Sequence, residues 1–179
     1  MFVVAGVSGN TGSVVAETLL ADGQKVRVIV RDAKKGEPWK ARGAEVAVAN
    51  LDDVAALTRA FEGAKGAYVL VPTNMASQDV RGEQRTIVDA LATAAKASHV
   101  PHVVFLSSVG AQHDFGTGPI AGLHDGEIAF AKAGVPLTAI RAAYFVENWG
   151  SSLAALGAGI LPTFLAAGQK IPMVATKDI

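Results

Sequence analysis

The chain has 179 residues, of which 50% are hydrophobic and 18% charged, and its 16 basic and 16 acidic residues leave no formal net charge. This balance excludes a disordered tail, a collagenous fibre and a basic nucleic-acid-binding arm, and it fits one folded domain with a sizeable core. Cysteine is absent, which excludes disulfides, zinc fingers and thiol nucleophiles. The apolar start at Met1–Ala5 carries no basic residue before it, so we expect a cytoplasmic protein.

One stretch is long enough to cross a bilayer. No charged residue occurs between Asn148 and Gln169. Serines, glycines and a central Pro162 leave few large aliphatic side chains there, which favours a helix, a turn and a second short segment. We therefore expect no membrane span.

Short runs of β-branched residues alternate with longer segments of helical period. The runs are mostly apolar at consecutive positions, as expected for parallel strands covered on both faces. The expected strands are Phe2–Ala5, Val26–Val30, Glu45–Val48, Ala67–Val71, Val103–Leu106 and Leu137–Ile140. The alternation predicts an α/β fold of the Rossmann type, a doubly wound parallel sheet with helices on both faces.

The longest helical pattern follows the fourth expected strand, where Val80, Gln84, Ile87, Leu91 and Ala94 recur at steps of three and four. A sheet of this kind binds ligands at the carboxyl ends of its strands. The loops at 6–13, 31–36, 49–53, 72–78, 107–122 and 141–150 are therefore expected to face the site.

The first strand ends in a glycine-rich loop that runs from Gly6 through Gly9 to Gly12, and a helical pattern follows from Ser13. Glycines at this spacing let a pyrophosphate reach backbone amides and let the helix pass close to the strand, while the helix start attracts the anion. The side chains of Ser8, Asn10 and Thr11 can add donors or cap the helix. The loop predicts a dinucleotide-binding site.

The end of the second strand indicates which dinucleotide binds. Arg31 stands directly after Val30, where a guanidinium suits the 2′-phosphate of NADP, and Lys34 and Lys35 add positive charge. Asp32 has two interpretations, a ribose-binding acid displaced by one residue or the cap of the next helix, and we favour the cap. We expect NADPH to be preferred over NADH.

Five segments together resemble the NmrA-like family of atypical short-chain dehydrogenases/reductases. They are the glycine loop, "VRVIVRDAKK" (26–35), "ANLDDVAALTRAF" (49–61), "VPHVVFLSSVGA" (100–111) and "AGVPLTAIRAAYFVENW" (133–149). The last is most similar to type 2 NAD(P)H:quinone oxidoreductases and triphenylmethane reductases. The resemblance implies an NAD(P)-binding Rossmann domain over 1–142 and the beginning of a substrate-binding region over 143–179. It also implies a chain that continues, because "KIPMVATKDI" (170–179) resembles an interior segment of the family.

The resemblance extends the expected cofactor site. Asn50 stands where the family commonly has an aspartate that reads the adenine, and an amide can make the same contact. Val71, Pro72 and Thr73 are expected along the ribose and nicotinamide path, although Pro72 can equally just end a strand. The full expected cofactor set is Gly6, Ser8, Gly9, Asn10, Thr11, Gly12, Arg31, Lys35, Asn50, Leu51, Val71, Pro72, Thr73, Ser107, Tyr144 and Phe145.

The usual Ser, Tyr and Lys machinery of carbonyl reduction is incomplete. Ser107 and Ser108 end the fifth strand, but neither Tyr68 nor Tyr144 is followed by lysine at the fourth position. We name Ser108 and His124 as candidate catalytic residues. His124 can donate a proton or orient a carbonyl; alternatively, it is merely exposed while the acids at 125 and 127 favour a helix start.

The aromatic segment after the sixth strand has two interpretations as well. Tyr144, Phe145 and Trp149 can stack on a planar ring or anchor the following helix. No metal is expected, because His99 and His102 lie at the other end of their strand without a carboxylate beside them.

The leading hypothesis is an NADPH-dependent oxidoreductase that transfers hydride to a quinone or a similar planar acceptor. The alternative is a non-catalytic, NmrA-like redox sensor that binds NADP and acts through a protein partner. The expected partner of the leading hypothesis is a small planar molecule, with no direct nucleic-acid or membrane contact. A homodimer is compatible with the sequence.

Overall fold

The computed structural model describes residues 1–153, 155–163, 165–166 and 168–179. Six strands form one parallel sheet in the order β3-β2-β1-β4-β5-β6. Their bounds are β1 Phe2–Ala5, β2 Val26–Val30, β3 Glu45–Val48, β4 Gly66–Val69, β5 Val103–Ser108 and β6 Leu137–Ala142. The strand order reverses between β1 and β4, so the predicted doubly wound Rossmann-type sheet is confirmed.

The first three strands have the bounds expected from the sequence, and the last three differ. β4 starts one residue and ends two residues before its expected bounds. It follows β1, whose Phe2 lies opposite Gly66 and which ends at Ala5. β5 and β6 are longer than expected because they pair with each other as far as Ser108 and Ala142. Polar residues that look like a loop in the sequence therefore belong to the sheet.

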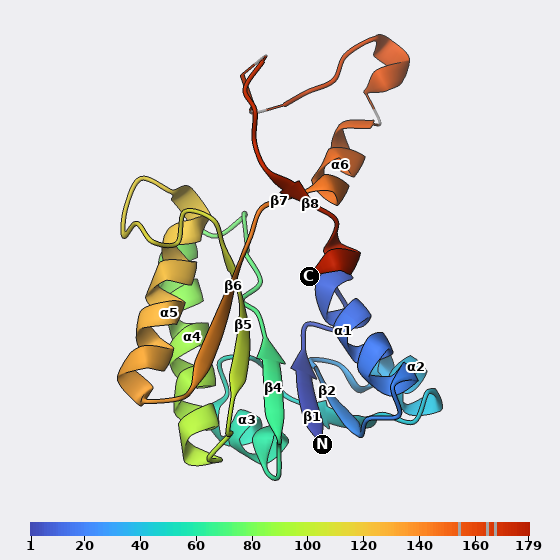
Figure 1. The fold of residues 1–179 in the computed structure, drawn as a ribbon, viewed down its shortest axis with the longest axis vertical. Coiled ribbons are helices and arrows are strands. Elements are labelled where there is room, and N and C mark those ends of the chain that lie inside the picture. Colours follow the sequence, from blue (N-terminus) through green and yellow to red (C-terminus); the bar gives the residue numbers. More distant parts are fainter. Residues whose placement is uncertain (154, 164, 167) are drawn as a thin grey trace.

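The helices divide between the two faces of the sheet (Figure 1). Helices α1 (Asn10–Ala21) and α2 (Ala33–Ala41) cover one face, and α3 (Val54–Phe61), α4 (Val80–Ala97) and α5 (Ala121–Ala133) cover the other. Side chains that alternate along a strand point to opposite faces, and β1 accordingly sends Val3 to the α3 and α4 side and Val4 to the α1 side.

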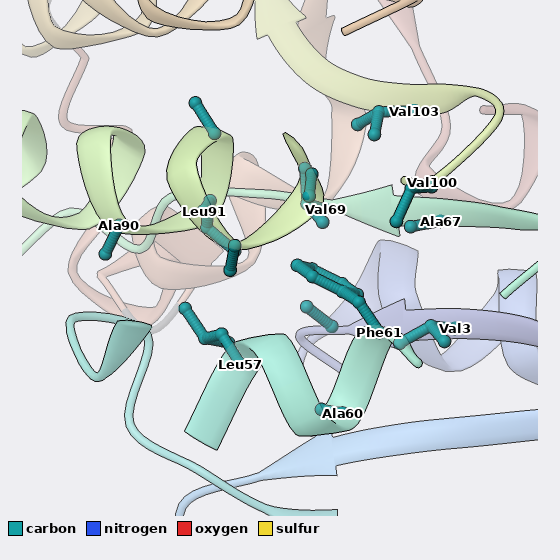
Figure 2. Packing of buried hydrophobic residues seen from close by; sticks show 14 of the residues in the cluster. Val3, Leu57, Ala60, Phe61, Ala67, Val69, Ala90, Leu91, Val100 and Val103 are labelled. Carbon is teal, nitrogen blue, oxygen red and sulfur yellow. The ribbon is translucent and has the colours of Figure 1, made fainter. Parts of the chain in front are cut away.

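The larger core lies on the α3, α4 and α5 face. Figure 2 shows Leu57 and Phe61 of α3 beside Leu91 of α4 and Val69 of β4. Farther along the sheet, Phe105 of β5 and Phe130 of α5 place their ring centroids 5.7 Å apart. This apolar layer fixes α4 and α5 against the strands whose carboxyl ends carry the candidate site.

The opposite face is covered only in part. Between α1 and strands β1, β4, β5 and β6 runs a groove of about 580 Å³ with mainly apolar walls, which include Val15, Leu19, Val104 and Ile140. Tyr68 of β4 also lines it, and burial raises the pKa of this phenol. The groove lies on the flank of the sheet, away from the carboxyl edge to which the glycine loop belongs.

The segment after β6 forms a small second sheet, in which β7 (Tyr144–Phe145) pairs in parallel with β8 (Met173–Val174). Glu147 fastens it, because its carboxylate accepts hydrogen bonds from the backbone N–H and the hydroxyl of Thr176 at 2.8–3.1 Å. A hydrogen bond from the backbone of Glu147 itself, followed by these bonds from Thr176, lowers the pKa of the Glu147 carboxyl.

The remaining short elements are η1 Gly118–Ile120, η2 Val146–Trp149, α6 Gly150–Leu153, η3 Leu156–Ala158 and η4 Thr176–Asp178. Among the described residues, no helix has the length and apolar character needed to cross a membrane. Three positions of the charge-free stretch, 154, 164 and 167, lie outside the described residues. The predicted boundary after residue 142 coincides with the end of β6 and stays a prediction.

Candidate functional site

The glycine loop joins β1 to α1 with a geometry that only glycine permits at two positions. Gly6 has a φ of +77°, and its carbonyl accepts the backbone N–H of Gly9 at 2.9 Å. At Gly12 an added Cβ would lie 2.8 Å from the carbonyl oxygen of Ala5, because the first turn of α1 rests on the end of β1. The loop therefore exposes backbone at the carboxyl edge of the sheet, as the glycine spacing predicts.

No side chain among the described residues caps α1. Gly9 is the N-cap and has no side chain, so the alternative in which Ser8, Asn10 or Thr11 caps the helix is wrong, and their role as donors stays a prediction. Ser8 and Asn10 are exposed, whereas Thr11 is only 6% exposed. The first amides of α1 have no side-chain oxygen to satisfy them, which suits an anion at this helix start.

A pocket of about 250 Å³ leads from the glycine loop to the end of β2. Its walls are Gly6, Ser8, Gly9, Ile29, Val30, Arg31, Ala49, Leu51, Leu70 and Pro72. Six of these were expected from the sequence. The hydrophobic walls at Ile29, Val30, Ala49 and Leu70 were not expected, because buried strand ends carry no polar signal. Leu70 lies against Gly6, where a Cβ would come within 2.6 Å of its Cδ2.

One cation lines this pocket, and two more follow it in the sequence. Arg31 lies in its wall, and Lys34 and Lys35 follow in the first turn of α2; all three are exposed. No carboxylate of the described chain forms an ion pair with any of them. Asp32 caps α2, because its carboxylate accepts the Lys34 backbone N–H at 2.9 Å, which confirms the favoured interpretation.

The loop after β3 borders the same pocket. Leu51 is half-buried in its wall, and Asn50 is exposed with its carbonyl accepting the N–H of Asp53, the N-cap of α3. The side-chain amide of Asn50 makes no hydrogen bond within the described chain and is free to read a base.

After β4, the three expected residues differ in burial. Val71 is buried, whereas Pro72 and Thr73 are exposed. The Thr73 hydroxyl accepts a hydrogen bond from the Gln84 side-chain amide of α4 at 3.2 Å. Thr73 is therefore exposed at the carboxyl edge of the sheet, and the hydrogen bond from Gln84 fixes the position of its hydroxyl oxygen.

The ends of β5 and β6 share a polar network. Ser107 is 3% exposed and donates to Glu127 of α5 at 2.6 Å, and Arg141 of β6 binds the same carboxylate through two nitrogens at 2.6 and 3.0 Å. Burial opposes ionisation of Glu127, but the bonds from Arg141 and Ser107 outweigh it and hold its pKa below the ordinary value. The Ser107 hydroxyl thus uses its proton within the protein, and the Ser108 hydroxyl donates to the Val109 carbonyl.

His124 is anchored rather than free. Its ring is half-buried, and Nδ1 lies 2.8 Å from the Ala111 carbonyl oxygen. A carbonyl only accepts, so Nδ1 carries a proton and Nε2 is the nitrogen left for a ligand. The alternative in which nearby acids favour a helix start is wrong, because α5 begins at Ala121 and its first turn holds no acid. Asp125 instead pairs with Arg81 and Arg85 of α4.

The aromatic segment lies in the small second sheet. Tyr144 and Phe145 form β7 and are both half-buried. The Tyr144 and Trp149 rings meet edge to face, with centroids 6.1 Å apart. The structure tests no cofactor contact of these residues, so their roles stay predictions.

Comparison with known proteins places the chain in a family. The model of the NmrA-like family matches residues 1–167. The chain belongs to the NmrA-like family. An NAD(P)H azoreductase from Xenophilus azovorans is 28% identical over 148 residues, which cover 83% of this chain and 49% of the relative.

Two solved structures of reductases have the same fold. The NADPH-dependent quinone oxidoreductase from Escherichia coli, complexed with NADPH, is 26% identical with a TM-score of 0.74, over 89% of this chain and 55% of the other. The triphenylmethane reductase from Citrobacter sp., complexed with NADP(H), is 21% identical with a TM-score of 0.74, over 89% and 56%. The chain thus spans about half the length of these relatives.

Proposed function

We propose that this protein is an NADPH-dependent oxidoreductase that transfers hydride to a planar, electron-poor small molecule such as a quinone or an azo dye. The observation that carries the proposal is the pocket between the glycine loop and Arg31. It joins bare backbone at a helix start to an exposed guanidinium without a carboxylate partner in the described chain. That combination suits a dinucleotide with a pyrophosphate and a 2′-phosphate.

The residues present fit this cofactor on structural grounds. Gly12 lets the first turn of α1 pack closely against the end of β1, and the pocket beside the loop borders Gly6 and Gly9, where a diphosphate can reach backbone. Leu51, Leu70 and Pro72 give the pocket apolar walls for an adenine ring. When bound, the nicotinamide supplies the hydride.

The chain's own residues would position the acceptor and manage a proton. Quinone and azo groups accept hydride directly, so the protein needs chiefly to align the two rings and exclude water. His124 Nε2 is the ring nitrogen left to contact the acceptor, because Nδ1 donates to the Ala111 carbonyl, and Nε2 can donate a proton only when the ring is the imidazolium. The Glu127 carboxylate, ionised between Ser107 and Arg141, keeps the ends of β5 and β6 together.

The relatives support the acceptor class. One is named an NAD(P)H azoreductase and another an NADPH-dependent quinone oxidoreductase, and both act on planar conjugated groups by name. We therefore propose that this chain reduces acceptors of the same planar, conjugated class.

Turnover tests the proposal. We expect the protein to oxidise NADPH in the presence of a panel of simple benzoquinones, naphthoquinones and azo dyes, followed as loss of absorbance of the reduced nicotinamide. NADPH binding without turnover across the whole panel would instead favour the non-catalytic redox sensor. Heat-denatured protein is the control for direct chemical reduction of the quinones.

A further inference from the structure

Gln84 is a polar side chain in an apolar position. It lies on the α4 stripe that otherwise carries Ile87, Leu91 and Ala94, and only 1% of its surface is exposed. A buried carboxamide costs free energy unless its polar atoms are satisfied, so a glutamine in place of leucine or methionine at such a site requires a reason.

One of the two polar atoms of the carboxamide has a hydrogen-bond partner. The amide nitrogen donates to the Thr73 hydroxyl oxygen at 3.2 Å, across from α4 to the loop after β4. The carboxamide oxygen has no hydrogen-bond partner among the described residues. The structure records the donating orientation, which leaves the carboxamide oxygen and one amide proton without a partner among the described residues.

Helix α5 is shaped around this carboxamide. Gly122 faces Gln84, and a Cβ added to Gly122 would overlap the Gln84 carboxamide oxygen and its carbon. The backbone of α5 therefore closes over the side chain as tightly as glycine allows. This contact limits the rotation of the carboxamide and keeps bulk water away from it.

We propose that Gln84 is a positioning residue that makes the Thr73 hydroxyl a hydrogen-bond donor to the bound pyridine dinucleotide. Thr73 has one proton, and its oxygen already accepts from Gln84. The proton must therefore point away from Gln84, and no described residue accepts it. Thr73 is exposed at the carboxyl edge beside Pro72, which lines the dinucleotide pocket. The inference rests on the proposed cofactor, and it assigns the ligand an acceptor oxygen of the nicotinamide half.

A double-mutant cycle tests the coupling between the two side chains. NADPH affinity is measured by fluorescence titration for the wild type, Gln84→Met, Thr73→Val and the double variant. Each single substitution removes one hydrogen bond and is expected to raise Kd about 2- to 10-fold. Because Gln84 acts through Thr73, adding Gln84→Met to Thr73→Val is expected to change Kd no further.

Two glycine variants separate orientation from packing. Gly122→Ala pushes on the Gln84 carboxamide, whereas Gly126→Ala crowds Phe105 one turn later, at 2.8 Å from its Cζ. Both are expected to lower Tm, but only Gly122→Ala is expected to raise the Kd for NADPH. The pair also covers the case in which Gln84→Met does not fold.

The outcomes separate this inference from the proposed function. Additive effects in the cycle, or an unchanged Kd in Gln84→Met, overturn the positioning role and leave the function standing. NADPH binding with the expected coupling but no turnover overturns only the function. A wild-type protein that binds no dinucleotide overturns both.

Discussion

Arg31 follows the last residue of β2 and is exposed. It lines the same pocket as the backbone of the glycine loop. Its neighbours Lys34 and Lys35 add charge, but only Arg31 lines the pocket wall. Asp32 was the other candidate for a ribose contact. Its carboxylate accepts a hydrogen bond from the Lys34 backbone N–H and caps α2. At this scale the proposed preference for NADPH over NADH depends on one guanidinium.

We expect Arg31→Ala to weaken NADPH binding about 10- to 100-fold, because it removes one charge-assisted hydrogen bond to the 2′-phosphate. NADH has no such phosphate, so its affinity should change little. Fluorescence titration with both nucleotides measures the difference. Arg59→Ala is the control, because Arg59 is an exposed arginine in the last turn of α3, near the opposite edge of the sheet. An equal loss for NADPH and NADH in Arg31→Ala would contradict the assignment.

At the scale of elements, the sequence predicts the pattern of strands and helices well. β1, β2 and β3 have their expected bounds because each is a short, mostly apolar run of β-branched residues that ends at a loop. Local signals fail where a neighbouring strand decides, as when Ser107 and Ser108 join the sheet by pairing with Arg141 and Ala142.

In the candidate site too, the sequence shows the residues with a local signal and misses those that depend on packing between elements. The glycine loop and Arg31 are visible in the sequence because each has a residue type with one strong physical role. Gln84 is not visible, because its spacing assigns it to the apolar stripe of α4 and only the packing of Gly122 shows what the carboxamide contacts. Glu127 is missed for a similar reason, since its partners Ser107 and Arg141 come from two other elements.

A network of two ion pairs that share one carboxylate joins α4 to α5. Asp125 of α5 accepts from Arg81 at 2.6 and 2.8 Å and from Arg85 at 2.7 Å. The hydrogen bond from Arg81, followed by that from Arg85, lowers the pKa of Asp125 to about 2 although partial burial opposes this. The two helices that enclose Gln84 are thereby held together at one end.

We expect Asp125→Asn to lower the free energy of unfolding by roughly 1–2 kcal/mol at pH 7, since both arginines are partly exposed and screened. The folded pKa lies below the unfolded one, so this contribution is fully present above about pH 4 and is lost as the pH falls through about 2. Urea unfolding from pH 7 to pH 2 measures it. Asp89→Asn, at an exposed aspartate of α4, is the control. A difference between wild type and Asp125→Asn that stays constant down to pH 2 would exclude this linkage.

At the scale of the whole molecule, the two faces of the sheet are unequal. The α3, α4 and α5 face buries a continuous core, whereas the α1 face leaves the apolar groove of about 580 Å³ beside β4, β5 and β6. An apolar surface of this extent in contact with water favours binding of apolar probes and association between molecules. We therefore expect the groove to bind apolar probes and to offer a contact surface between molecules.

We expect the folded protein to enhance the fluorescence of the apolar dye anilinonaphthalene sulfonate and to self-associate as its concentration rises. Thr18→Glu should lower both effects several-fold, because Thr18 is exposed on the groove wall, where a carboxylate opposes an apolar ligand and repels the sulfonate. Thr86→Glu is the matched control, at an exposed threonine of α4 on the other face. Dye titration and sedimentation velocity provide the two measurements. Equal responses of the two variants would show that the dye and the self-contacts use another surface, and the exposed face of the sheet would then not explain the association.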